Sequence, residues 1–295
     1  MKILITGTNG FVGKRLINRL KQETSYDLHG IDDEYFAAEI WQDSLTSYLY
    51  DLDPDVIIHV GADTNTLERR VNYEMSRNHE ATKILVDWCA HRRLPFIYSS
   101  SAACYGVDGR TPSNLYGWSK YTAENYVTAM GGISLRYFNV YGPGEEHKGN
   151  MASFVYQAFL KNQKGEEISL FPGNPRRDFV HVDDVVNANI FALNNYVTLP
   201  KKHFDVGSGH ACSYERLMDV MGYKYTYCSE DVVPVGYQYY TRSNKQKWLP
   251  GWKPCYDIDY GLKTYKKYLT GWKPCYDIDY GLKTYKKYLT GDEDV

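Results

Sequence analysis

Short apolar runs alternate with amphipathic segments along the first half of the chain. The runs predict six strands: an N-terminal stretch, residues 26–31, a short stretch before Asp43, and residues 56–60, 95–99 and 133–139. Between them, apolar positions recur every three or four residues, which predicts helices directly after the first strand and over residues 73–91 and 114–130. Strands that alternate with helices in this way favour a parallel, doubly wound α/β sheet.

The first predicted turn is rich in glycine. Gly7, Gly10 and Gly13 lie around Phe11 and Val12, between the first strand and the first helix. Glycines at such a turn allow close approach to a pyrophosphate and close packing of helix on strand, and the helix N-terminus then faces the phosphates. The GxxGxxG spacing is a variant of the dinucleotide fingerprint GxGxxG, so the turn predicts a dinucleotide site, with an ordinary glycine turn as the alternative.

Acidic residues follow the second predicted strand. Asp32 and Asp33 come about twenty residues after the glycine turn, where a carboxylate can bind the adenosine 2′-hydroxyl and disfavour a 2′-phosphate. No Lys or Arg follows before Arg69, so the sequence modestly favours NAD over NADP. Asp43 is a candidate for the adenine end or, equally, for a helix N-cap. Three further candidates for cofactor contact lie after the fourth strand and on the helix behind it: Gly61, Ala62 and Asn78.

A hydroxyl, a phenol and an amine come together between residues 99 and 120. Ser101 follows the fifth strand, at the edge where open α/β sheets bind ligands. Tyr116 and Lys120 are four residues apart and share one helical face. An ammonium there can lower the pKa of a phenol from its usual ~10, and such a phenol can exchange a proton with a substrate hydroxyl. For Ser99 and Ser100 we expect only hydrogen bonds at the strand end.

The chain beyond residue 143 predicts a smaller domain that interleaves with returns to the sheet. Residues 151–161 are typical of a helix and residues 204–208 of a strand and turn. We expect a dinucleotide-binding domain of residues 1–143 with 179–205, and a substrate domain of residues 144–178 with 206–270. Residues 271–290 repeat residues 251–270, and two copies are too few for a solenoid. The second copy is expected to be non-essential, so that truncation after Thr270 leaves activity unchanged.

Composition narrows the possible functions. Charged residues make up 24% of the chain and the formal net charge is −2, which gives no electrostatic case for nucleic acid. No apolar run reaches the about 18 residues of a membrane span, and the N-terminus does not read as a signal peptide, so we expect a cytoplasmic protein. The six Cys residues show neither CxxC pairs nor metal-ligand spacing, which predicts reduced, mostly buried thiols and no metal.

A series of motifs gives these features a family. In chain order they are TGTNGFVG, HVGAD, YSSSAACYG, YGWSK, RYFNVYGP and RRDFVHVDDV. Together, over about residues 1–270, they resemble the extended short-chain dehydrogenase/reductase superfamily of nucleotide-sugar enzymes. Residues 136–154 resemble, more narrowly, the ADP-L-glycero-D-manno-heptose 6-epimerases. The resemblance implies a Rossmann fold, one bound NAD or NADP, a nucleotide-diphosphate sugar as substrate and a homo-oligomer.

The resemblance also implies roles for single residues. Ser101 is similar to the catalytic serine of the superfamily, Tyr116 to its general acid/base, and Lys120 to the residue that holds the nicotinamide ribose. Lys148, in the segment HKGN, corresponds to the second base of the heptose epimerases, although a lysine in a glycine-rich loop is more often simply solvated. Inversion of a carbinol through a ketone needs proton handling from two directions, which two such groups provide.

Two alanines favour an epimerase over a dehydratase. Dehydratase relatives place an Asp-Glu pair directly after the Ser/Thr, where this chain has Ala102 and Ala103. Arg176 and Arg177 are candidates for the substrate diphosphate, because an arginine can bind a phosphate in bidentate fashion. Solvation at the surface is an equally good interpretation of either residue. The residues expected to contact substrate are Ser101, Asn139, His147, Lys148, Arg176, Arg177 and Tyr237. Asp178 and residues 182–184 are expected to cap and orient a helix.

These inferences converge on an NAD(P)-dependent nucleotide-sugar epimerase, acting at C6″ of an ADP-heptose by transient oxidation to a ketone. A 4-epimerase or reductase of the same superfamily is one alternative. A cofactor-binding protein without turnover is another, and it is disfavoured because such a protein has no need of Ser101, Tyr116 and Lys120.

Overall fold

Six parallel strands form the central sheet of the protein, whose computed structural model describes residues 1–107, 109–234 and 237–271. The strands are β1 (Lys2–Thr6), β2 (Asp27–Ile31), β3 (Val56–His59), β4 (Phe96–Ser101), β5 (Ile133–Tyr137) and β9 (His203–Val206). Their order is β2-β1-β3-β4-β5-β9, so the winding direction reverses between β1 and β3. The predicted doubly wound α/β sheet is confirmed, and its ligand site is expected at this switch point.

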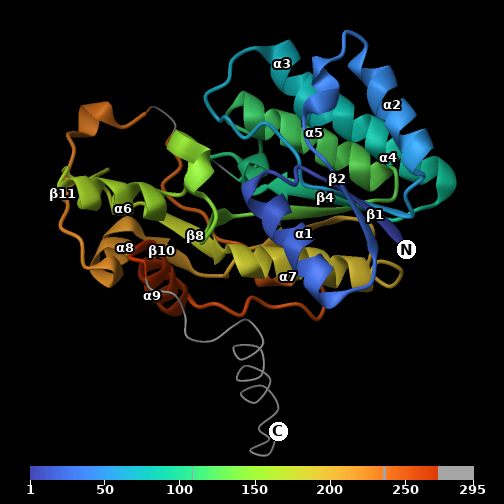
Figure 1. Ribbon diagram of the computed structural model, residues 1–295. Coiled ribbons are helices and arrows are strands. Elements are labelled where there is room, and N and C mark those ends of the chain that lie inside the picture. The colour runs from blue at the N-terminus through green and yellow to red at the C-terminus, as the bar shows by residue number, and fades with distance from the viewer. Residues whose placement is uncertain (108, 235–236, 272–295) are drawn as a thin grey trace, which may run out of the picture.

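Helices cover both faces of the sheet (Figure 1). One face carries α1 (Phe11–Glu23) and α7 (Val182–Asn194), and the other carries α2 (Trp41–Leu52), α4 (Ala81–Arg92) and α5 (Leu115–Ala129). Successive residues of β1 point to opposite faces: Ile3 and Ile5 pack with Leu16 of α1, whereas Leu4 packs with Leu45 of α2. Because both faces are buried, the strands read as nearly continuous apolar runs.

The third predicted strand is wrong. Residues 34–37 form a 3₁₀ helix (Glu34–Ala37), and α2 begins at Trp41. The apolar character of this stretch comes from a cluster of aromatic rings, in which Phe36 lies 4.4 Å from Tyr35 and 4.7 Å from Trp41 between ring centroids. The sixth strand of the sheet is β9, within the segment expected to be a strand and turn. The run at residues 133–139 divides into β5 and β6 (Asn139–Tyr141).

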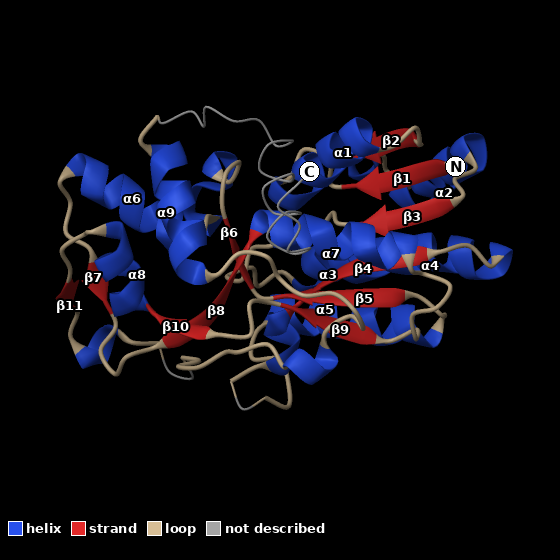
Figure 2. Cartoon of the chain, turned by 90° about the horizontal axis from the view of Figure 1, so that it is seen from below, coloured by secondary structure: helices blue, strands red, loops and turns tan. Residues whose placement is uncertain are grey.

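A smaller lobe packs beside the carboxyl edge of the large sheet (Figure 2). It contains a three-stranded sheet of order β10-β8-β6 and a two-stranded sheet of β11 and β7. Its elements are β7 (Ser169–Leu170), β8 (Arg176–His181), β10 (Ala211–Ser213), β11 (Thr226–Tyr227), α6 (Phe154–Lys164), α8 (Tyr214–Met221) and α9 (Ile258–Leu269). A separate core gathers Tyr141, Leu217 and Leu262. The helix expected from residue 151 begins at Phe154, and the division into two interleaved domains stays a prediction.

The helix predicted at residues 73–91 runs from residue 71 to residue 92. It consists of α3 (Val71–Met75), a π-helical turn (Ser76–Glu80) and α4, with helical backbone angles at each junction. The remaining short helices are of the 3₁₀ type, at Ala102–Tyr105, Glu146–Met151, Glu230–Val232 and Lys245–Lys247. A π-helical turn inside an α-helix is frequently found at a functional site.

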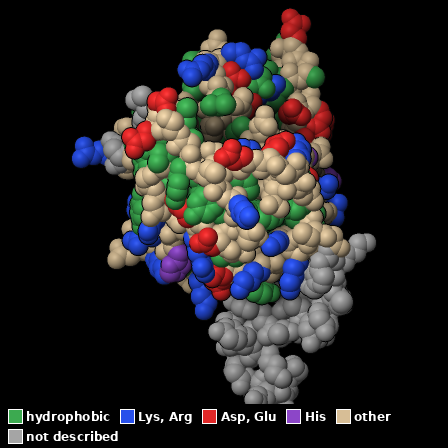
Figure 3. Space-filling view, turned by 90° about the vertical axis from the view of Figure 1, so that its left-hand side faces the viewer, with side chains coloured by type: hydrophobic (Ala, Val, Ile, Leu, Met, Phe, Trp, Pro, Cys, Tyr) green, Lys and Arg blue, Asp and Glu red, His purple; other side chains and the backbone are tan. Residues whose placement is uncertain are grey.

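The surface and the thiols agree with the composition. Charged side chains of both signs are dispersed over the face formed by the smaller lobe (Figure 3). Among the cysteines in the described ranges, Cys89, Cys104 and Cys212 are buried, Cys228 is half-buried and Cys255 is exposed. Within the described ranges, every helix is too short or too polar to traverse a bilayer. The second copy of the repeat, from residue 272 onward, lies outside the described residues.

Candidate active site

A cleft of about 730 Å³ opens between the large sheet and the smaller lobe. Its floor comes from residues at the carboxyl ends of four strands: Gly7 after β1, Gly61 after β3, Ser101 at the end of β4 and Asn139 after β5. Residues 147, 148 and 151–154 of the smaller lobe form part of the opposite wall. The cleft therefore lies at the predicted switch point and has a volume typical of small-molecule sites.

The glycine turn is shaped by close backbone contacts. Gly7 has φ +71°, and a Cβ there would lie 2.6 Å from the Cα of Gly61. A Cβ on Gly13 would overlap the carbonyl group of Gly7, at 2.7 Å from its carbon. Gly10 is the N-cap of α1 and provides no side chain to its free amides. Because these positions and Phe11 line the cleft, the open helix N-terminus fits the diphosphate of a dinucleotide.

Asp32 and Asp33 line the cleft beyond β2, as predicted, and Asp43 does not lie with them. The carboxylate of Asp32 accepts hydrogen bonds from the hydroxyl of Thr8 at 2.8 Å and the amide of Asn9 at 2.9 Å. The glycine turn thus holds it at the edge of the cleft. Asp43 is exposed in the first turn of α2, whose N-cap is residue 40, so the N-cap interpretation is wrong and contact with the adenine end stays a prediction.

Asn78 is buried behind the cleft. Its side chain accepts from the amide of Asp63 at 2.8 Å and donates to the carbonyl of Asp63 at 2.9 Å. The same nitrogen lies 3.0 Å from the hydroxyl of Ser119 on α5. Asn78 therefore links the loop after β3 to α5. Gly61 and Ala62 of that loop line the cleft, whereas Asn78, a predicted cofactor contact, lies behind the loop.

Ser101, Tyr116 and Lys120 meet in the cleft, as the sequence predicts. Helix α5 begins where the side chain of Asn114 accepts a hydrogen bond from the amide of Gly117 at 2.7 Å, which places Tyr116 in the first turn. Ser101 accepts from a backbone amide at 3.1 Å at the end of β4. The hydroxyls of Ser99 and Ser100 make the expected hydrogen bonds at the strand end, to Tyr137 and Cys104, and both residues also line the cleft.

The expected lowering of the Tyr116 pKa is wrong for this structure. Burial raises the pKa of the phenol to about 12, against the opposing effect of a hydrogen bond from Ser101. Burial also lowers the pKa of Lys120 to about 8. The ammonium lies 4.2 Å from the ring centre of Tyr98 and interacts with that aromatic face. Loss of water around the two groups is the main cause of both pKa shifts.

Lys148 enters the cleft from the smaller lobe. Its amine lies 5.4 Å from the ring centre of Phe11 in the glycine turn, so it spans the gap between the lobes. Burial lowers the pKa of Lys148, and the carboxyl of Glu145 opposes that shift. His147 is exposed and lines the same wall. Asn139 also lines the cleft and donates to the carbonyl of residue 178 at 3.1 Å.

The two arginines and the tyrosine expected to contact substrate are not among the described residues that line the cleft. Arg176 is exposed at the start of β8. Arg177 is mostly buried, with its guanidinium carbon 5.0 Å from the ring centre of Tyr237. Tyr237 interacts with Tyr214, which lines the cleft. The structure therefore places Arg177 and Tyr237 behind Tyr214 and leaves Arg176 outside.

The acidic residues of the RRDFVHVDD segment are structural, though not all in the expected way. Asp178 is buried and accepts hydrogen bonds from the amide and hydroxyl of Ser208, both at 2.7 Å, so it anchors a loop rather than a helix end. Asp183 forms an ion pair with Arg15 of α1. Asp184 accepts from the amides of residues 255 and 256 at 2.7 and 3.0 Å. The last two hold the N-terminus of α7 in place.

The sequence interpretation missed Arg77. Its guanidinium carbon lies 4.3 Å from the ring centres of both Phe36 and Tyr73, and all three side chains line the cleft. The residue sits on the π-helical turn, which the fold brings beside the loop that follows β2. No local motif in the sequence points to Arg77. A search for a basic residue near Asp32 finds only residues that are close along the chain, and Arg77 is close to this loop only in the folded protein.

Comparisons with known proteins agree with this geometry. The model of the NAD dependent epimerase/dehydratase family matches residues 3–207. The ADP-L-glycero-D-manno-heptose-6-epimerase of Brachyspira hyodysenteriae is 30% identical over 89% of this chain and 96% of its own length.

Solved structures show the same fold. The heptose 6-epimerase of Helicobacter pylori is 27% identical, with a TM-score of 0.78 over 91% of this chain and 96% of that one. The UDP-glucose 4-epimerase of Thermotoga maritima, solved with UDP-glucose, is 24% identical, with a TM-score of 0.78 over 92% and 99% of the two chains. The protein is therefore an isomerase, a member of the NAD dependent epimerase/dehydratase family within the extended short-chain dehydrogenases/reductases.

Proposed function

We propose that the protein is an ADP-glyceromanno-heptose 6-epimerase, which inverts C6″ of its sugar through a transient ketone. The observation that carries this proposal is that Tyr116 with Ser101 and, from the other lobe, Lys148 line one cleft. Two proton-handling groups on different lobes suit a reaction that takes and returns hydrogen on opposite faces of one carbon. The heptose epimerases of Brachyspira and Helicobacter, similar over most of the chain, support the choice of sugar.

Each residue has a definite task in this reaction. When bound, the nicotinamide supplies the hydride acceptor and donor. Tyr116 exchanges a proton with the oxygen at C6″, and Ser101 hydrogen-bonds the same oxygen and holds it in line with the phenol. Lys120 would hold the nicotinamide ribose when the cofactor is bound. Lys148 exchanges a proton from the other side, and burial lowers its pKa below that of a solvated lysine, which favours proton release.

We propose NAD as the preferred cofactor. The carboxylate of Asp32, held at the edge of the cleft by the glycine turn, fits a ribose hydroxyl and opposes a phosphate on the same carbon. Arg77 introduces an opposing positive charge into the cleft. Calorimetric titration with NAD and NADP measures the two dissociation constants. Asp32→Asn is expected to reduce the ratio of the constant for NADP to that for NAD, and Arg77→Gln is expected to increase it. Tighter binding of NADP to the unaltered protein would refute the proposal.

We also propose that the substrate diphosphate extends toward the wall formed by Tyr214. Arg177, behind that wall and stacked on Tyr237, is the buried one of the two arginines that the sequence offers for the diphosphate. Arg177→Lys is expected to raise KM with little change in kcat, since it removes the bidentate fork while keeping the charge. The exposed Arg176→Lys serves as the matched control.

The test of the proposed function is direct. The purified protein is incubated with NAD and ADP-D-glycero-D-manno-heptose, and the product is analysed by NMR, with Tyr116→Phe as the control. The expected product is the L-glycero epimer, formed by the unaltered protein alone. If no epimer forms while another nucleotide sugar, such as UDP-glucose, is inverted, the heptose assignment fails and only the family function remains.

A further inference from the structure

A carboxyl group lies buried behind the catalytic helix. Glu74 is the fourth residue of α3, and its side chain is fully buried. Its Oε1 accepts from the side-chain nitrogen of Asn78 at 2.7 Å and from the hydroxyl of Ser119 at 3.3 Å. Its Oε2 is buried too and has no hydrogen-bond partner within the part of the chain that the structure describes. Ser119 lies between Tyr116 and Lys120 on α5.

A chain of buried polar groups leads from this carboxyl group to the cofactor side of the cleft. The carbonyl of Asn78 accepts from the hydroxyl of Thr82 at 2.8 Å, and that hydroxyl lies 2.9 Å from the ring of His59. The other ring nitrogen of His59 lies 2.6 Å from Thr6, which accepts from the amide of Gly61 at 2.9 Å. Burial lowers the pKa of His59 to about 3, so its ring stays neutral near pH 7.

Glu74 is the member of this chain that titrates near neutral pH. Burial, as the main cause, raises its pKa to about 7. The charged groups facing it are Asp63 and Glu68 from the loop after β3, which favour the neutral form, and Lys120 from α5, which favours the anion. The anion in turn raises the pKa of Tyr116 and that of Lys120.

We propose that Glu74, hydrogen-bonded to α5 through Ser119, is a positioning residue of the catalytic centre, whose charge shifts the protonation equilibria of Tyr116 and Lys120 from behind that helix. When the carboxyl is ionised, the phenol and the ammonium both retain their protons more strongly. When the carboxyl is neutral, the phenol loses its proton more readily. A larger fraction of Tyr116 is then phenolate, the form that accepts a proton from substrate. The inference rests on the proposed function only for the role of Tyr116.

The test uses Glu74→Gln, which keeps the size and the acceptor oxygen while removing the charge. Tyrosinate formation is followed by ultraviolet absorbance in a pH titration, and each protein is compared with its own Tyr116→Phe version to isolate one phenol. The midpoint for Tyr116 is expected to fall by roughly half to one pH unit in the variant, as for loss of one nearby charge in a partly buried site. An unchanged midpoint overturns the proposal.

The matched control is Asp184→Asn. Asp184 is another fully buried carboxyl whose pKa burial raises to about 7, but it contacts the backbone near residue 255 instead of the catalytic helix. Its substitution should leave the Tyr116 midpoint in place. An equal shift in both variants would mean a general loosening of the fold and would also overturn the proposal.

Two further readouts complete the experiment. With any nucleotide sugar that the protein inverts, the ratio of variant to wild-type kcat should change at least twofold between about pH 6 and about pH 8, on either side of the Glu74 pKa. A ratio that is constant across pH indicates a purely structural role and contradicts the proposal. Failure of Glu74→Gln to fold at about pH 6 also contradicts the proposal. At that pH the wild-type carboxyl is mostly neutral, so misfolding of the neutral variant would indicate a structural role. If no heptose is inverted, the proposed function fails but the phenol titration still decides this inference.

Discussion

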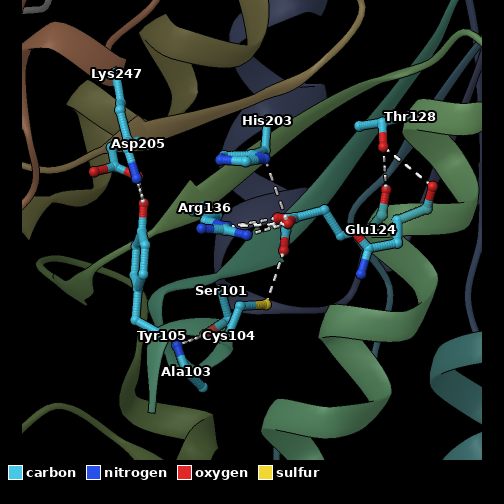
Figure 4. A network of polar contacts seen from close by, with 12 residues as sticks. Ser101, Ala103, Cys104, Tyr105, Glu124, Thr128, Arg136, His203, Asp205 and Lys247 are labelled. Atoms are coloured by element: carbon cyan, nitrogen blue, oxygen red, sulfur yellow. Dashed lines mark hydrogen bonds and ion pairs between the residues drawn. The ribbon is translucent and has the colours of Figure 1, made fainter. Parts of the chain in front are cut away.

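A buried ion pair joins the catalytic helix to the neighbouring strand (Figure 4). Arg136 of β5 is 5% exposed and Glu124 of α5 is fully buried. The guanidinium Nε donates to the two carboxylate oxygens at 2.8 and 3.1 Å, and a terminal nitrogen donates to one of them as well. The ring of Tyr105 lies 4.4 Å from the guanidinium carbon. His203 lies 3.7 Å from the carboxylate, and burial, followed by the charge of Arg136, lowers the pKa of its imidazole.

Arg136→Met removes the partner and leaves a buried carboxylate without a charge to balance it. Breaking such a pair from one side costs about 3–5 kcal/mol, and loss of the contact with Tyr105 adds about 0.5–1 kcal/mol. The nearby Cys104 thiol cannot compensate, because its only charged form is an anion; burial raises its pKa to about 11, so it stays neutral and adds no further negative charge. We therefore expect the free energy of unfolding to fall by about 4 kcal/mol, while the apolar length of the side chain is retained.

Urea unfolding at pH 7 measures this loss, and a double-mutant cycle with Glu124→Leu separates the penalty of the orphaned charge from the net value of the pair. The double variant is expected to recover most of the stability, because a buried pair replaced on both sides is often neutral or stabilising. A loss below about 1 kcal/mol for Arg136→Met, or strictly additive effects in the cycle, would refute the reasoning, since either means that the carboxylate finds water or protonates at little cost.

Four other outcomes are expected. Gly13→Ala should weaken NAD binding at least tenfold, about 1.4 kcal/mol, in calorimetry, whereas the exposed Asn18→Ala on the same helix should not. Tyr116→Phe should lower kcat by about 10²–10⁴ without changing the melting temperature, and near-normal turnover would exclude its role. Lys148→Met should reduce kcat about 10²-fold while NAD binding persists. Asp184 has its pKa raised to about 7, so the stability that its protonated form contributes is lost as pH rises through 7. The melting temperature should therefore fall between about pH 6 and about pH 8, and less in Asp184→Asn, as calorimetric scans at both values would show.

The order of elements and the core of the site could be read from the sequence because both depend on short-range patterns. The glycine turn and the Tyr116–Lys120 spacing are local features, and the sheet presents them at one edge whatever the rest of the chain does. The stretch at residues 34–41 misled for the same reason. Its aromatic rings pack against one another across a short helix, and the local sequence pattern of such a cluster is the same as that of a short strand.

What the sequence could not show depends on contacts between distant segments. Arg77 reaches the cleft because a π-helical turn lies beside the loop after β2, and Asn78 on the same turn faces the other way, into the protein. The pKa of Tyr116 follows from the water that the folded lobes exclude, which no spacing of charges along a helix predicts. Arg177 and Tyr237 proved to be partners of each other, which only the packing of the smaller lobe reveals.

The last described helix contributes to the active site without lining it. The phenol of Tyr265 in α9 donates to the carboxyl of Glu145 at 2.9 Å, and that carboxyl also accepts from the hydroxyl of Ser153 at 2.7 Å. These two bonds brace the loop that carries Lys148. A premature stop codon just before position 265 should therefore keep every residue that lines the cleft and still yield an inactive enzyme. Saturation mutagenesis of this gene should then find sensitive codons well beyond the last residue that lines the cleft.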